Sequence, residues 1–190
     1  MTDTALRYVL RRGRIRLRTR HELCEVRPDG SDGGVIATIQ LGEMGDDVGT
    51  VFYADPEATR PMFAFTGSIL RESFDVTDDT GVVLGSFRKE WKKSFFRSTW
   101  HLTTSDGLEA VGRERSRAAA IGRRISDDIP FLVSHFDFVT SDGHTVFSSL
   151  RRRTLWPEYE LTAPLLPDGR QLDWRMAAAM GAALEIIQSR

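Results

Sequence analysis

Cysteine is almost absent from this 190-residue sequence, and asparagine is absent altogether. The single cysteine, Cys24, excludes an internal disulfide and a site built on several thiolates. Together with the lack of an apolar secretory leader at the first residues, it predicts a reducing, cytoplasmic location. Without asparagine, tight turns must depend on aspartate and glycine. Lysine is scarce too, with 3 against 23 arginines, which we interpret as GC-rich coding bias.

Sequence patterns typical of catalysis are also absent. The four histidines have no metal-ligand spacing, and there is no Walker A loop, no dinucleotide fingerprint and no nucleophile elbow. We therefore expect neither an enzyme nor a metal or cofactor site. The formal net charge of −1 gives no general attraction to nucleic acid, so nucleic acid is not expected as a partner.

A short pattern recurs instead, in which an apolar alternation leads into an aspartate-glycine turn and a second alternation follows. The clearest copies turn at Gly81, Gly107 and Gly143, and weaker copies turn at Gly30 and Gly169. Alternation around a turn that needs positive φ predicts a β-hairpin. Five hairpins in tandem predict a meander that closes on itself and so buries its edges.

Shorter patterns predict the remaining strands and loops. One strand should place Val35, Ala37 and Ile39 on the same face, because alternate residues of a strand share a face. Residues 42–50 are rich in glycine and aspartate and predict a loop. We find no linker or low-complexity tract, so residues 1–190 are expected to form a single domain.

The last element has a different character. Asp173 is a good N-cap for a helix over 174–188, and residues 176–184 include no polar side chain. A helix that is apolar all round is buried in protein or in membrane. This one would span roughly 22 Å, and a membrane span needs about 20 apolar residues. We therefore expect a core helix rather than a membrane anchor, with Gly181 almost inaccessible.

The order of these elements resembles the tubby-C-terminal-like superfamily, and within it the LURP-one-related and phospholipid-scramblase-like proteins. The resemblance is carried by Tyr8-Val9-Leu10, by Phe74-Asp75-Val76-Thr77-Asp78, by the run from Gly85 to Trp91, and by Leu172-Asp173-Trp174-Arg175-Met176 before the apolar helix. It implies a mainly β fold, a closed antiparallel barrel of about 12 strands around a buried hydrophobic C-terminal helix.

The resemblance implies no common enzymatic activity. Tubby proteins bind phosphoinositides, and scramblases act at membranes with calcium. Aligning Gly81 with the glycine of a calcium loop leaves only Asp78 as a good ligand, and no cysteine cluster is present for lipidation. Calcium-dependent scrambling is therefore not implied for this chain.

Basic residues are the best candidates for a binding site. From Arg12 to Arg20 every second residue is arginine, so five guanidinium groups would line one face of a strand over roughly 27 Å. A phosphate or acidic protein surface would relieve their repulsion; pairing with carboxylates on neighbouring strands is the alternative. The candidate anion- or lipid-binding residues are Arg12, Arg14, Arg16, Arg18, Arg20, Lys89, Lys92, Lys93, Arg151, Arg152 and Arg153.

The lysines among these candidates are interleaved with Trp91, Phe95 and Phe96. Aromatic and basic side chains together suit either a membrane interface or an ordinary hairpin with one buried face. The sequence thus predicts a non-enzymatic binding module for anionic phospholipid headgroups or an acidic protein, with peripheral contact at the inner membrane face and no transmembrane span. A scramblase-type lipid-active protein is the alternative, and a hydrolase built on an open barrel mouth comes third.

Overall fold

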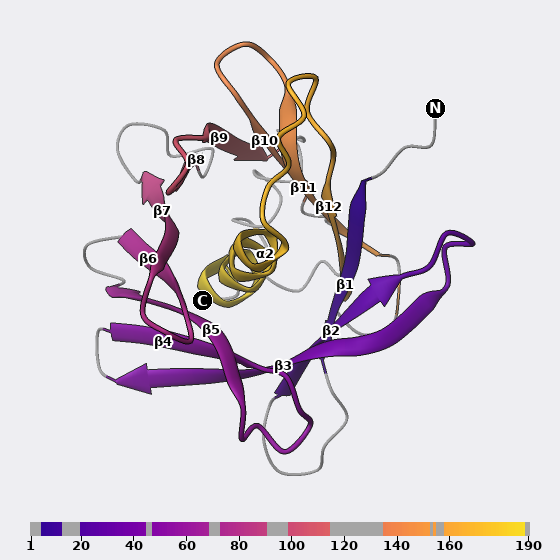
Figure 1. The fold of residues 1–190 in the computed structure, drawn as a ribbon, viewed down its shortest axis with the longest axis vertical. Helices are drawn as coiled ribbons and strands as arrows, with labels where there is room; N and C mark the ends of the chain where they lie inside the picture. Colours follow the sequence, from indigo (N-terminus) through magenta and orange to yellow (C-terminus); the bar gives the residue numbers. More distant parts are fainter. Residues whose placement is uncertain are drawn as a thin grey trace, which may run out of the picture.

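The fold is a closed antiparallel β-barrel with a helix along its interior. The computed structural model describes residues 5–12, 20–44, 47–68, 73–90, 99–114, 135–152, 154 and 158–188. Within them, each strand pairs with its neighbours in sequence, and the first strand pairs with the twelfth. Figure 1 shows the helix, α2 (Trp174–Gln188), inside the ring of strands. The expected fold, a mainly β closed barrel with a C-terminal helix inside, is confirmed.

The strands are β1 (Leu6–Arg12), β2 (Arg20–Val26), β3 (Asp32–Met44), β4 (Asp47–Tyr53), β5 (Pro61–Ser68), β6 (Ser73–Asp78), β7 (Val83–Glu90), β8 (Thr99–Thr104), β9 (Glu109–Glu114), β10 (His135–Val139), β11 (Thr145–Arg151) and β12 (Glu158–Ala163). The loop predicted over 42–50 is wrong, because most of those residues belong to β3 and β4. Gly42 lies opposite Gly49 in that ladder. The pairing overrides the low strand propensity of glycine and aspartate.

All five predicted turn glycines have positive φ, between 82° and 91°. The turns share one hydrogen-bond scheme, as in the β8–β9 turn, where Thr104 N donates to Leu108 O and Gly107 N donates to Thr104 O, each at 3.0 Å. This is a type I turn followed by a left-handed glycine, a common three-residue hairpin loop. Four copies join paired strands, as predicted. The fifth, at Gly169, instead leads from β12 through the isolated Leu165–Gln171 bridge into α2.

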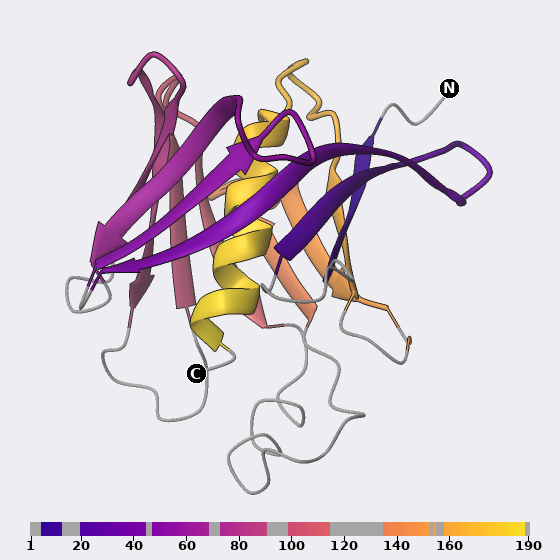
Figure 2. The same cartoon turned by 90° about the horizontal axis from the view of Figure 1, so that it is seen from below.

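Because consecutive strands are neighbours, their connections alternate between the two ends of the barrel. We call the turn end the one that holds the β2–β3, β4–β5, β6–β7, β8–β9, β10–β11 and β12–α2 connections. The far end holds the β1–β2, β3–β4, β5–β6, β7–β8, β9–β10 and β11–β12 connections. Helix α2 starts at the turn end and runs toward the far end, along the barrel as seen in Figure 2.

The helix fits the lumen because its middle is made of small or unbranched side chains. Its start is capped by Asp173, whose Oδ1 accepts a hydrogen bond of 2.8 Å from Arg175 N. Met180 is fully buried, and the surroundings of Gly181 leave no room for a side chain, since a Cβ there would lie 2.6 Å from Leu161 Cδ1. The expected buried core helix is confirmed. Within the described residues, no helix is both long and apolar enough to cross a membrane.

Aromatic side chains fill the space between the helix and one side of the wall. Phe52 stacks on Phe63 with ring centroids 4.1 Å apart, and Trp174 of the helix meets Phe63 edge-on at 5.4 Å. Phe74 stacks on Phe87 at 5.3 Å on the next strands. Such pairs contribute about 0.5–1.5 kcal/mol each beyond the burial of their area. The helix is therefore held by specific ring packing as well as by exclusion of water.

Val35 departs from its predicted face. Ala37 and Ile39 are buried as expected, but Val35 is 46% exposed. The cause is a bulge, because Leu23 pairs with Ala37 while the next residue, Cys24, pairs with Val35. One extra residue in β3 reverses the side on which Val35 lies.

Candidate functional site

Much of the predicted arginine row lies outside the described residues. Arg14, Arg16, Arg18, Lys92, Lys93 and Arg153 are not described. Arg12 ends β1 and Arg20 begins β2, and only their backbone is described. The alternation of this row on one strand face therefore stays a prediction.

Lys89 does not lie on an outer basic surface. It is 7% exposed and shares the inward face of β7 with Gly85 and Phe87. Its ammonium group lies 5.7 Å from the centroid of the Trp100 ring, a cation–π distance. A signal for this was in the sequence, because Lys89 has the same strand parity as Phe87.

Arg152 is part of an ion-pair network on the outer face where β1 meets its neighbours. Its Nη1 lies 2.8 Å from Asp32 Oδ1, and its Nε lies 3.5 Å from Glu160 Oε2. Glu160 also pairs with Arg7, whose Nη2 lies 2.5 Å from Glu160 Oε1. Asp32 also pairs with Arg11, whose Nη1 lies 3.7 Å from Asp32 Oδ2. Arg152 is thus already matched by carboxylates of its own barrel, as in the ion-paired alternative considered for the basic residues.

The network, completed by the pair of Arg11 with Glu22 at 3.0 Å, holds three arginines and three carboxylates. Val9 and Cys24, paired across β1 and β2, are fully buried on the same face as these side chains. Burial also raises the pKa of the Cys24 thiol, so the single cysteine is a buried, unreactive side chain. This surface supports the closure of the barrel. Arg151, the remaining described candidate, is half-buried at the end of β11.

The two ends of the barrel differ in the charge of the sequences that connect their strands. The far-end connections are 13–19, 45–46, 69–72, 91–98, 115–134 and 152–157, and the turn-end connections are 27–31, 54–60, 79–82, 105–108, 140–144 and 164–173. The far-end connections hold 13 arginines or lysines and 4 acidic residues. The turn-end connections hold 3 arginines or lysines and 8 acidic residues. Sequence reasoning missed this polarity because it appears only once strand order assigns each connection to an end.

Aspartates at the turn end stabilise the loops in which they lie. Asp78 accepts hydrogen bonds from the Thr80 hydroxyl and from the backbone of Thr80 and Val82 at 2.7–2.9 Å. The Thr80 hydroxyl and the Val82 amide hold the pKa of Asp78 below its usual value. Asp55 accepts the backbone amides of Thr59 and Arg60 in the β4–β5 loop, and its pKa is lowered in the same way.

At the far end a buried polar pair holds the end of the helix. His21 Nε2 lies 3.1 Å from Glu185 Oε1, and both side chains are largely buried. His21 is the second residue of β2, so the contact ties the last turns of α2 to the barrel wall. The Nδ1 atom of His21 is buried without a hydrogen-bond partner. Glu185 is therefore mostly buried, although it lies in the last turns of the helix.

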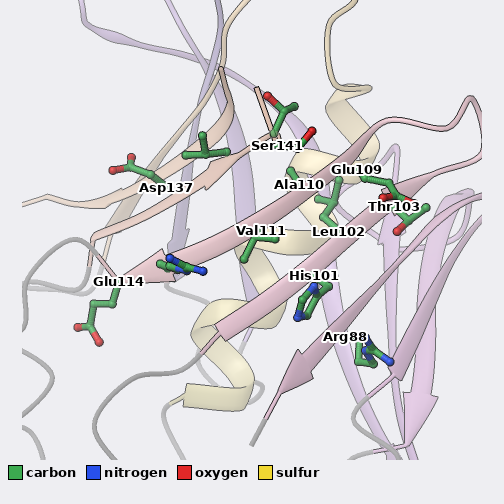
Figure 3. Close-up of a pocket in the computed structure, with 13 residues that line it drawn as sticks. Arg88, His101, Leu102, Thr103, Glu109, Ala110, Val111, Glu114, Asp137 and Ser141 are labelled. Carbon is green, nitrogen blue, oxygen red and sulfur yellow. The ribbon is translucent and has the colours of Figure 1, made fainter. Parts of the chain in front are cut away.

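The outer wall carries a groove of about 760 Å³ over β8, β9 and β10, shown in Figure 3. Val111 and Val139 supply apolar lining, while Arg88, His101 and Arg113 supply basic groups. His101 Nε2 lies 3.1 Å from Glu90 Oε2. Asp137 accepts a hydrogen bond of 2.8 Å from the Ser148 hydroxyl. The volume is within the range of small-molecule sites, which is about 300–1,000 Å³.

Small residues lie on the inner face of β9, behind the groove. Ala110 and Gly112 point inward there, and a Cβ on Gly112 would collide with the ring of Phe138. The flanking strands carry large inward residues, Trp100 on β8 and Phe138 on β10. The Phe138 ring therefore covers Gly112 on the inner face, and Val111 and Arg113 of β9 face the groove. Sequence reasoning missed this groove, although the strand parity of Arg88, His101 and Arg113 already places them outward.

No protein-family model matches the sequence, and no curated protein matches it. The resemblance to the tubby-like and scramblase-like proteins stays a prediction. Within the described ranges, no three histidine, cysteine, aspartate or glutamate side chains are placed to bind a metal ion.

Proposed function

We propose that this protein is a non-enzymatic binding module whose far end holds an anionic partner, with phospholipid headgroups as the first candidate. The observation that carries the proposal is the charge polarity of the barrel. The connections at the far end hold 13 basic and 4 acidic residues. The connections at the turn end hold 3 basic and 8 acidic residues. A molecule with a net charge of −1 thus combines two ends of opposite sign.

The polarity supports binding with orientation rather than general adhesion. An anionic surface attracts the far end and repels the turn end, so the barrel would approach it along its axis. Of the described arginines, Arg7, Arg11 and Arg152 are matched by carboxylates on the side wall. The proposal therefore depends on the other basic residues of the far-end connections.

The test is sedimentation with vesicles of neutral phosphatidylcholine, with and without anionic phosphatidylserine. We expect binding only to the anionic vesicles, and we expect it to weaken with salt as the Debye length falls from about 10 Å at 0.1 M to about 3 Å at 1 M. The variant R14Q/R16Q/R18Q should lose this binding while its unfolding curve stays close to that of the parent.

The matched control is R27Q/R60Q/R170Q, which removes the same charge at the turn end, where all three side chains are exposed. It should bind as the parent does. Equal loss in both variants would show that only net charge matters and would overturn the proposal. Binding to an acidic protein but to no vesicle would assign the far end to the protein partner instead of lipid.

A further inference from the structure

The groove over β8–β10 contains basic groups without an ion-pair partner among the described residues. They are Arg88 and Arg113, and both are exposed. The same is true of Glu109, which lines the groove next to Thr103. His101, by contrast, is held by Glu90, and Asp137 by Ser148. The groove charges without an ion-pair partner among the described residues include Arg88, Arg113 and Glu109. The Ser148 hydroxyl holds the Asp137 carboxylate without neutralising it.

The strand register places the two unmatched arginines around one point. Arg88 lies directly opposite His101, and His101 lies directly opposite Val111, two residues before Arg113. Strands lie about 4.8 Å apart and rise about 3.3 Å per residue, so the two arginine Cα atoms are separated by roughly 12 Å. Two extended arginine side chains can bridge that distance and meet above His101.

The part of the groove nearer the turn end is lined by acidic and hydroxyl side chains. Glu109 pairs with Thr103 across β9 and β8, two residues from Val111 toward the turn end. Ser141 of the β10–β11 turn lines the same part, and Figure 3 shows Glu109 and Thr103 together, away from Arg88. These groups accept or exchange hydrogen bonds with hydroxyl groups. Val111 lies between the two parts.

We propose that this groove binds a small hydroxylated organic phosphate. Arg88 and Arg113 hold the phosphate above His101, since two guanidinium forks offer more donors than a carboxylate can accept. The hydroxyl-bearing part crosses Val111 and reaches Glu109 and Thr103. A flat anionic membrane fits less well, because it would press its charge against Glu109 and Asp137. This site is separate from the far end and does not depend on the function proposed there.

The test is a titration of the ¹⁵N-labelled full chain with inorganic phosphate and with glycerol 3-phosphate at constant ionic strength. We expect saturable shifts at the amides of His101, Val111 and Arg113, with tighter binding of glycerol 3-phosphate. The variant R88Q/R113Q should lose at least tenfold in affinity for both probes. The matched control R27Q/R170Q carries the same charge change at the turn end and should bind both as the parent does.

A second variant tests the hydroxyl end of the groove. E109Q should keep phosphate binding and lose the preference for glycerol 3-phosphate. Unchanged affinity in R88Q/R113Q, equal loss in the control, or shifts that never saturate would each overturn the proposal. If neither probe binds, while R88Q/R113Q loses binding to phosphatidic acid vesicles, a lipid surface is the ligand and the compact-ligand proposal is wrong. Vesicle binding by R14Q/R16Q/R18Q tests the function proposed for the far end, and its outcome does not depend on this groove.

Discussion

The two ends of this barrel are built on different principles. At the turn end, four connections are three-residue loops of one design, each with a left-handed glycine, and the link into α2 repeats that design. At the far end the connections differ in length from 2 to 20 residues and carry 13 of the 26 basic residues of the chain. The comparison separates two tasks within one chain. Local turn chemistry sets strand order and register, while the opposite end is free to vary in sequence.

The largest expected effect on stability concerns helix α2, which runs from one end of the barrel to the other. Gly181→Leu places a side chain where Leu161 already lies, with a Cβ contact of 2.6 Å to Leu161 Cδ1. We expect the free energy of unfolding in urea to fall by about 1–3 kcal/mol or more. The control is Gly34→Leu, where no atom lies within 4 Å of the added Cβ. An unchanged midpoint in G181L would show that the lumen is loosely filled.

An intermediate effect is expected at the turn end. Alanine at Gly81, Gly107 or Gly143 must adopt a φ of 83–91°, which costs roughly 1–2 kcal/mol per residue. Each single variant should therefore lose about 1–2 kcal/mol in the free energy of unfolding. Gly49→Ala in β4 meets only an ordinary 3.9 Å contact with Thr66 and should change stability little. Equal losses in the turn variants and in Gly49→Ala would remove the special role of the turns.

The smallest effect is a dependence on acid that originates at the turn end. The Thr80 hydroxyl and the Val82 amide lower the pKa of Asp78, and the Thr59 amide lowers that of Asp55. A carboxyl with a depressed folded pKa stabilises the fold fully above its unfolded pKa of about 3.9, and this stability is lost as pH falls through the folded value. Urea unfolding from pH 7 to pH 3 should show that loss, and D55N/D78N should flatten it. An identical slope would refute the assignment.

The turns and the helix could be predicted from sequence because their signals are local. An aspartate followed by glycine specifies a hairpin loop within five residues, and an uninterrupted apolar run specifies a buried helix without reference to the rest of the chain. The one turn misassigned in its role, at Gly169, has the correct local geometry. The prediction was wrong only about the segment after this turn, which is helix α2 and not a strand.

The side chains of the wall were harder to place because their partners are distant in sequence. Arg152 pairs with Asp32, 120 residues away, and no local pattern predicts such a partner. The small residues Ala110 and Gly112 of β9 lie behind the groove between strands with large ones, which is a property of three neighbouring strands. Val35 was misplaced by a single bulge, since period-two reasoning fails wherever one residue is added.

The pairing of β1 with β12 has a consequence for how the chain is made. Arg7 and Glu160, 153 residues apart, form one of its ion pairs, so β1 stays without this partner strand until β12 has been synthesised. Until then the edge of β1 remains available to other chains, and the aromatic lumen has no helix to fill it. Nascent chains stopped before residue 158 should therefore need protection from aggregation, and the pairing of β12 with β1 is the event that removes the exposed edge.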